Sequence, residues 1–163
     1  METNIRVAKD HDIEHILAFS RKLCDFNRAN HDARCTYDDY SLVAEAVTQK
    51  MRETFQNRDK NTLFLIAETG ETPIGYVFAR IYEEAPTNDN GTGKVGLLDE
   101  LFLDEQARGL GLGQCLMDEV MEWFKSNDIR RVKLHAYSWN IGAKAVYEKN
   151  GFKEYAVSYE KFI

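Results

Sequence analysis

The sequence lacks the long apolar runs, the paired cysteines and the excess of positive charge that mark several classes of protein. No apolar stretch approaches the ~20 residues of a membrane-spanning helix, and Met1-Glu2-Thr3-Asn4 has no feature of a secretory signal, so we expect neither. Cys24, Cys35 and Cys115 form no Cys-x-x-Cys or Cys/His ligand pattern, which favours reduced thiols, a cytoplasmic location and no metal site. A net charge of −6 argues against a nucleic-acid partner, because nucleic-acid binders usually carry basic patches.

The remaining composition is that of an ordinary globular protein. With 163 residues, 44% of them hydrophobic and 29% charged, the chain is expected to form one domain over residues 1–163. Strand and helix patterns follow one another along it, which predicts a mixed α/β sheet. The expected elements are a strand at 5–7, a helix from Asp10 or Asp12 to about Phe26, a polar loop at 27–36, a helix from Asp38 or Asp39 to Gln56, a hairpin of strands 63–67 and 74–82, a mobile loop at 85–94, a strand at 97–103, a helix after Gly113, a strand at 130–137, a helix from Asn140 to Gly151 and a last strand around 155–162.

Glycine is concentrated in the middle of the chain, where six of the ten glycines lie between positions 91 and 113. The last three belong to Arg108-Gly109-Leu110-Gly111-Leu112-Gly113, between the apolar strand and a helix whose inner face is Leu116, Val120, Trp123 and Phe124. The first N–H groups of a helix have no partner within it, and the helix dipole adds positive charge there. Because glycines let a ligand approach that backbone, this loop predicts a phosphate-binding site.

Three phosphate-binding motifs compete for this loop. A P-loop requires Lys after its last glycine, where this chain has Gln114. A dinucleotide fingerprint requires a third glycine at the same position, and it should open the first βαβ unit instead of lying two-thirds along the chain. The remaining pattern, Arg/Gln-x-x-Gly-x-Gly/Ala, is satisfied by Arg108, Gly111 and Gly113 and resembles the coenzyme A pyrophosphate loop of the GNAT N-acetyltransferase superfamily.

A second signature follows one helix and one strand later. Residues 140–152 match Asn-x-x-Ala-x-x-x-Tyr-x-x-x-Gly-Phe, a pattern that is similar to the other motif of the same superfamily. The resemblance is close from about Leu97 to Phe152 and covers the N-terminal half only in the order of its elements. It implies a mixed, mostly antiparallel central sheet with helices on both faces, splayed between the two central parallel strands.

The resemblance implies an acetyl-CoA-dependent N-acetyltransferase that moves an acetyl group from the CoA thioester to a primary amine. Arg108 would add charge to the pyrophosphate loop, Asn140 would hold a pantetheine amide, and Tyr147 would hand a proton to the departing thiolate. The alternatives for these three residues are a solvated loop arginine, a helix N-cap and a core aromatic, respectively. The implied cofactor-binding residues are Leu101, Phe102, Leu103, Arg108, Gly109, Leu110, Gly111, Leu112, Gly113, Gln114, Asn140, Ala143 and Tyr147.

The general base stays open between Asp99 and Glu100, which are adjacent in an otherwise apolar strand. Alternation sends them to opposite faces unless a bulge intervenes, so at most one is expected to face the cleft directly. His135 is a third candidate, although a strand histidine is more often merely packed. Cys115 has no His or Asp partner at a recognisable spacing, which favours direct attack in a ternary complex over an acyl-cysteine intermediate.

The acceptor pocket has no motif, and its prediction rests on charge. An acidic cluster would attract a cation, so we expect a small cationic amine; solvated carboxylates are the alternative. Acetylation of a protein N-terminus or lysine, and a non-catalytic acyl-CoA-binding module, are the rival functions. The oligomeric state is open, although homodimers are common among such folds. The acidic residues expected around the pocket are Asp32, Asp38, Asp39, Glu83, Glu84 and Asp89, with Asp99 and Glu100 at the reaction centre.

Overall fold

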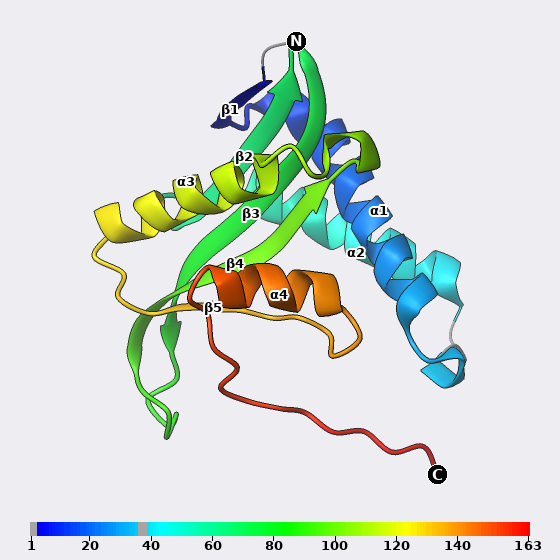
Figure 1. Ribbon diagram of the computed structural model, residues 1–163, viewed down its shortest axis with the longest axis vertical. Coiled ribbons are helices and arrows are strands. Elements are labelled where there is room, and N and C mark those ends of the chain that lie inside the picture. The colour runs from blue at the N-terminus through cyan, green and yellow to red at the C-terminus, as the bar shows by residue number, and fades with distance from the viewer. Residues whose placement is uncertain (1–2, 36–38) are drawn as a thin grey trace.

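A five-stranded sheet with helices on both faces forms the centre of the computed structural model, which describes residues 3–35 and 39–163 (Figure 1). The strands lie in chain order: β1 (Thr3–Val7), β2 (Thr62–Thr69), β3 (Thr72–Glu84), β4 (Gly93–Leu103) and β5 (Val132–Leu134). Neighbours from β1 to β4 pair antiparallel, and β5 pairs parallel to β4. The predicted mixed, mostly antiparallel sheet is therefore confirmed.

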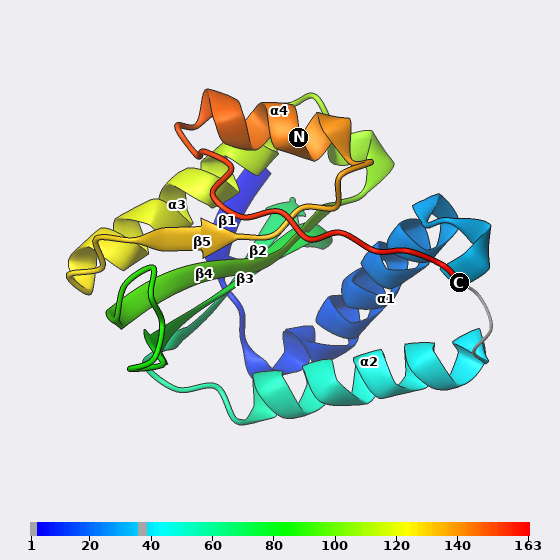
Figure 2. The ribbon, with the colours of Figure 1, turned by 90° about the horizontal axis from the view of Figure 1, so that it is seen from below.

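The helices form two layers, one on each side of the sheet (Figure 2). Helices α1 (Ile13–Asn30) and α2 (Tyr40–Gln56) cover one face, and α3 (Leu112–Ser126) and α4 (Ile141–Lys149) lie over the other. None of the helices in residues 3–35 and 39–163 is both long and apolar enough to span a bilayer.

Alternation along β2 and β3 divides the interior into two cores. Phe64 and Tyr76 pack with α1 and α2, whereas Leu65 and Val77 pack with α3. Because both faces of these strands are covered, residues 63–67 form an unbroken apolar run in the sequence.

Each of the last three long helices begins where its first N–H groups are accessible or capped. The Asp39 side chain accepts from the Ser41 N–H at 3.0 Å at the start of α2, while Asp38, the other predicted start, lies outside the described residues. Asn140 caps α4 with its side chain, and Gly111 precedes α3 without any side-chain cap. Short 3₁₀ turns lie at Asp10–Asp12 (η1), Ala33–Cys35 (η2) and Glu105–Ala107 (η3).

The strand predicted around 155–162 is wrong, because no strand forms after Leu134 in the described residues. Apolar alternation predicts which side chains share a face, but a strand also requires a neighbour for its backbone, and β5 is only three residues long. The Tyr155 ring instead lies 5.7 Å from the Arg131 guanidinium and 5.4 Å from the Lys133 ammonium. Because no strand pairs with its outer side, β5 is an edge strand of the described sheet and not a central one.

Two predicted loops are shorter than expected. Strands β3 and β4 pair as far as Glu84 and Gly93, so the connection expected over 85–94 is the tip of a long hairpin that reaches past the other strands (Figure 1). Helix α1 continues to Asn30, and η2 occupies 33–35, inside the predicted polar loop. Cross-strand pairing and helix propagation extend elements beyond their strongest apolar pattern.

A β-bulge and an early strand end together open the sheet beside β4. In the β3–β4 ladder Phe78 pairs with Glu100 and Ala79 with Leu98, so Asp99 is the extra residue of a bulge. At the same level the parallel ladder ends at Leu98 and Leu134, while β4 continues to Leu103. The two parallel strands therefore part at Asp99.

Gly96 sets how closely α3 approaches β4, and this contact generates a stability prediction. A Cβ at Gly96 would lie 2.6–2.8 Å from three atoms of the buried Phe124 ring. We expect Gly96→Ala to lower the free energy of unfolding in urea by ~1–3 kcal/mol, the usual cost of overpacking.

The control is Gly142→Ala on α4, where a Cβ meets nothing within 4 Å. It should leave stability unchanged or raise it by up to ~1 kcal/mol, since alanine favours helix. Equal stability of Gly96→Ala and the unmodified protein would contradict the packing argument.

Candidate active site

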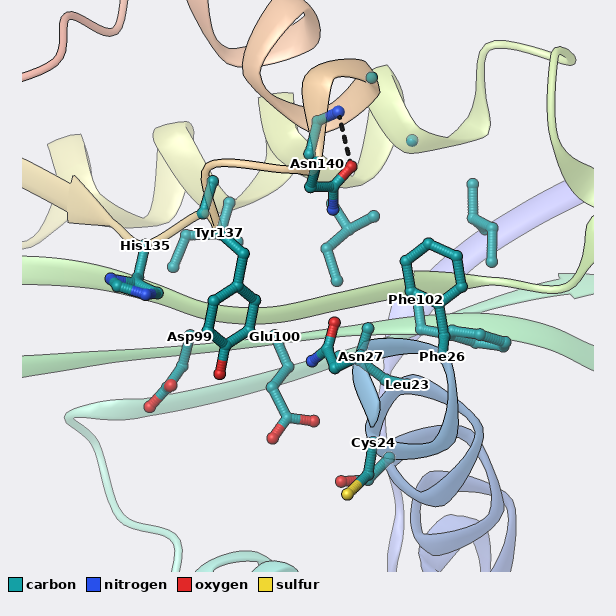
Figure 3. A pocket seen from close by; sticks show the side chains of 18 of the residues that line it. Leu23, Cys24, Phe26, Asn27, Asp99, Glu100, Phe102, His135, Tyr137 and Asn140 are labelled. Atoms are coloured by element: carbon teal, nitrogen blue, oxygen red, sulfur yellow. Dashed lines mark hydrogen bonds between the residues drawn. The ribbon is translucent and has the colours of Figure 1, made fainter. Parts of the chain in front are cut away.

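A cavity of about 840 Å³ lies where β4 and β5 part, and most of the predicted site residues reach it (Figure 3). Its walls come from α1, α2, β4, the residues after β5, the start of α3, and α4. Five predicted residues stand beside it in the loop and first turn of α3 without lining it: Gly109, Leu110, Gly111, Leu112 and Gln114. The predicted residues that line it are Asp99, Glu100, Leu101, Phe102, Leu103, Arg108, Gly113, Asn140, Ala143 and Tyr147.

The bulge brings both adjacent carboxylates into the cavity. Asp99 and Glu100 leave β4 toward the same side in Figure 3, which simple alternation would forbid. Asp99 is exposed and forms an ion pair with Arg80 at 2.9 Å. Glu100 is partly buried, and burial raises its pKa above the ordinary value of a glutamate. The two carboxylates thus differ in environment, and Glu100 has the character of a tuned acid–base group.

Tyr76, which the sequence patterns did not single out, holds Glu100 in place. Its hydroxyl donates a hydrogen bond to Glu100 Oε2 from a side chain that is 0% exposed on β3. This bond offsets part of the rise that burial causes in the pKa of Glu100. Burial and the nearby carboxylate also raise the pKa of Tyr76 well above its ordinary value, so it stays a donor. The only sequence signal was a tyrosine in a buried strand, whose hydroxyl must find a partner.

The glycine loop presents an open helix N-terminus. Gly109 and Gly111 have φ of +77° and +80°, conformations that side chains rarely adopt, and a Cβ at either meets nothing within 4 Å. The first N–H groups of a helix have no acceptor within it, and at the start of α3 no side chain caps them. Arg108 is exposed, yet its Nε donates to the Leu103 carbonyl at 3.1 Å, which ties the loop to the end of β4. These features fit a phosphate of an acyl-CoA.

Helix α4 contributes Asn140 and Tyr147 to the same cavity. The Asn140 side-chain oxygen accepts from the Ala143 N–H at 3.2 Å, so the N-cap alternative holds (Figure 3). Tyr147 packs edge-on against Phe152, with ring centroids 6.2 Å apart, and burial raises its pKa. Tyr147 is thus both a packed aromatic and a phenol at the cavity wall.

The remaining candidates differ in position. His135 lines the cavity just after β5, with its ring 5.4 Å from that of Tyr137. Cys115 is exposed on α3 and does not line the cavity. Within residues 3–35 and 39–163, no three His, Cys, Asp or Glu side chains gather where a metal ion could be held.

The acidic wall predicted around the acceptor pocket does not form in the described residues. Only Asp99 and Glu100 supply carboxylates to the cavity there. Asp32 is paired with Arg34 at 2.7 Å, and Glu84 is buried in an ion pair with Lys133. Asp39 caps α2 as described above, neither Glu83 nor Asp89 lines the cavity, and Asp38 lies outside the described residues. The prediction failed because charge in a sequence does not tell which carboxylates already have partners.

Comparisons with known proteins give an independent result. The sequence model of the acetyltransferase (GNAT) family matches residues 26–152. A mycothiol acetyltransferase of Geodermatophilus obscurus is 32% identical over 94 residues, which are 58% of this chain; the chain spans only 30% of that relative's length.

Two solved structures share the fold. A putative acetyl transferase from Pyrococcus furiosus has a TM-score of 0.76 and 23% identity, with 99% of this chain and 100% of that chain covered. A protein from Clostridium acetobutylicum, described as a predicted acetyltransferase with acetyl-CoA, has a TM-score of 0.73 and 21% identity, with 99% and 96% covered.

The open space at Gly111 generates a binding prediction. In Gly111→Ala the new methyl group would occupy the approach to the first turn of α3, so the Kd for acetyl-CoA should rise at least ~10-fold in calorimetry. The matched control is Gly70→Ala in the β2–β3 turn, where φ is +62° and the space is equally open.

Both variants carry the same kind of backbone strain, of ~1–2 kcal/mol, so thermal unfolding should shift similarly in the two. If the two variants bind acetyl-CoA with equal affinity, the prediction that this loop binds the phosphate is wrong.

Proposed function

This chain belongs to the acetyltransferase (GNAT) family, and from that premise we propose that it transfers an acetyl group from acetyl-CoA to a primary amine. The amine arrives as a small cation and attacks the thioester directly in a ternary complex. The observation that carries the proposal is a single cavity lined by the open edge of β4, by Arg108 beside the glycine loop and by the buried carboxylate of Glu100. The residues proposed to bind the cofactor and the proposed acid–base group therefore line the same cavity.

The proposed acetyl-CoA contacts use backbone and side-chain groups that keep hydrogen-bonding capacity or charge for a ligand. The pyrophosphate lies on the N–H groups of the first turn of α3, with positive charge from Arg108. The pantetheine arm pairs with the β4 backbone over Leu101–Leu103, as an added strand would. Strand β5 no longer pairs with β4 there, so this edge of β4 is open. Asn140 keeps its side-chain amide N–H groups available for a pantetheine carbonyl, since its capping bond uses only the oxygen.

Glu100 is the general base of the proposed reaction. It takes a proton from the bound ammonium, and the neutral amine then forms a C–N bond to the thioester carbon, which gives a tetrahedral intermediate. The C–S bond breaks when this intermediate collapses, and the second proton that the nitrogen loses replaces the one that Tyr147 donates to the sulfur. A raised pKa makes Glu100 a stronger base than an ordinary carboxylate. Asp99 suits this role less because Arg80 already neutralises it.

Tyr147 supplies the proton that the leaving thiolate needs. Its phenol stays protonated at neutral pH, since burial raises its pKa further. The thiolate leaves as the free thiol, which lowers the barrier to collapse of the tetrahedral intermediate.

The rival functions are weaker on these observations. A non-catalytic acyl-CoA-binding module would not need a carboxylate that Tyr76 holds in the same cavity as Tyr147. A protein amine as acceptor would be distinguished by a peptide screen for thiol release.

The three cysteines are free, which supports a reducing, cytoplasmic setting.

Replacing Tyr147 tests the proton donor. Tyr147→Phe should lower kcat by ~10²–10⁴-fold, the usual contribution of general acid catalysis, with acetyl-CoA affinity unchanged. Thiol release from acetyl-CoA measures the rate, and Tyr159→Phe, at a position 93% exposed, is the control. An unaltered kcat in Tyr147→Phe would reduce Tyr147 to a packing residue.

The pH profile tests the base and its partner together. Because Glu100 must be deprotonated, kcat/KM should rise with pH through its raised pKa. Tyr76→Phe removes a hydrogen bond that lowers this pKa, so the acidic limb should move to higher pH. Glu100→Gln should remove the limb and cost ~10²–10⁴-fold in kcat/KM.

Asp99→Asn is the matched control for the pH profile and should keep the acidic limb in place. If the limb disappears in Asp99→Asn and persists in Glu100→Gln, the assignment of the base is reversed.

A further inference from the structure

The cavity has an aromatic wall, formed by rings from two segments far apart in sequence. The Tyr137 ring stacks on Trp139 at 5.6 Å and meets His31 edge-on at 4.4 Å. The Phe26 ring meets Trp139 at 5.8 Å, and His135 meets Tyr137 at 5.4 Å. We refer to Phe26, His31, His135, Tyr137 and Trp139 as the aromatic wall; all but Trp139 line the cavity.

The aromatic wall is held in place by a polar contact. Trp139 Nε1 donates to His31 Nδ1 at 3.2 Å, which joins residues 108 positions apart. His31 is the C-cap of α1, and its N–H donates to the Asn27 carbonyl at 3.1 Å. The end of α1 and the segment after β5 are therefore fixed to one another before any acceptor arrives.

Part of the wall still lacks a partner. The side chains of Phe26 and Tyr137 are 41% and 40% exposed, although both line a cavity, and Figure 3 shows them on opposite sides of Asn27 and Glu100. Open aromatic surface in a cavity that also presents polar side chains is typical of a small-molecule site.

The acceptor side also presents aliphatic surface, next to polar side chains such as Asn27 and Tyr40. Leu23 of α1 and Val43 and Val47 of α2 line it, and the Arg28 guanidinium lies over the Tyr40 ring at 4.9 Å. An amino sugar or a polyamine would bring further charged or hydroxyl groups against these side chains. Such groups would lose their water and gain few carboxylate partners, because Asp32 and Glu84 pair elsewhere and Asp99 already pairs with Arg80.

We propose that the acceptor is an arylalkyl primary amine, in which a short chain joins the amine to an aromatic ring. The ammonium end meets Glu100, and the ring lies against Tyr137 and Phe26. Offset or edge-on contact with these rings favours an aromatic body over an aliphatic one, and the ring faces also attract the cation as it enters. This inference rests on the acetyl transfer proposed above and names the substrate class for the same cavity.

Three primary amines of similar reach test the substrate class. We expect kcat/KM for thiol release from acetyl-CoA to be at least ~10-fold higher with 2-phenylethylamine than with n-butylamine, and lowest with putrescine, whose second ammonium would have to compete with Arg80 for Asp99. Putrescine or an aminoglycoside used as well as 2-phenylethylamine would overturn the proposal.

Two variants tie this preference to the wall. Tyr137→Ala and Phe26→Ala should each lower kcat/KM for 2-phenylethylamine by ~10-fold or more and change that for n-butylamine by no more than ~3-fold. The control is Tyr159→Ala, on the exposed C-terminal segment, which should change neither. Acetyl-CoA affinity and thermal unfolding of each variant identify any that is misfolded, and calorimetry of 2-phenylethylamine binding with CoA present gives a second readout.

The outcomes separate the two proposals. If n-butylamine is acetylated but neither the ring preference nor the selective loss in the variants is seen, the arylalkyl class is wrong and acetyl transfer stands. If acetyl-CoA binds and no amine or peptide releases thiol, acetyl transfer itself is wrong and the acceptor class falls with it.

Discussion

The parallel ladder between β4 and β5 ends at Leu98 and Leu134, and the candidate site depends on that ending. Beyond it, β4 continues to Leu103 with one edge open, while the chain after β5 moves away and carries His135 and Tyr137 to the opposite wall. Backbone N–H and C=O groups beside a cavity need partners, which water or the amides of a cosubstrate can supply. The bulge at Asp99 falls at the same level and turns both carboxylates into the space that opens.

The proposed cofactor-binding end is built from contacts that also hold the fold together. Gly96 allows Phe124 of α3 to pack directly on β4, so the helix that begins at the glycine loop lies close to the strand edge. Arg108 then fixes the loop to the last residue of that strand through its bond to the Leu103 carbonyl. A shift of α3 would therefore move the proposed phosphate site relative to the proposed thioester site.

Net charge and local charge give different information about this protein. The chain carries a net charge of −6, yet three of the six acidic residues expected around the acceptor pocket are paired or cap a helix: Asp32 with Arg34, Glu84 with Lys133, Asp39 on α2. What distinguishes the cavity is one carboxylate in a partly buried position with a tyrosine behind it. Overall charge bears on solubility and long-range attraction, whereas the chemistry of a site depends on which few charges are buried there.

The sequence by itself determined the features that depend on local pattern. Helix and strand periods predicted most elements of the sheet, glycines at 109 and 111 indicated the open helix start, and the spacing of Asn140 and Tyr147 placed both on one side of a short helix. Only the tertiary structure decided which strands pair, where the bulge falls, and which side chains meet Glu100. Tyr76 is 24 residues from Glu100, and His31 is 108 from Trp139, so no local pattern links them. The predicted last strand failed for the same reason, because a strand requires a neighbour that alternation along one segment cannot supply. Such contacts are selected by the packing of whole layers against the sheet, which is a property of the folded chain and not of any one stretch.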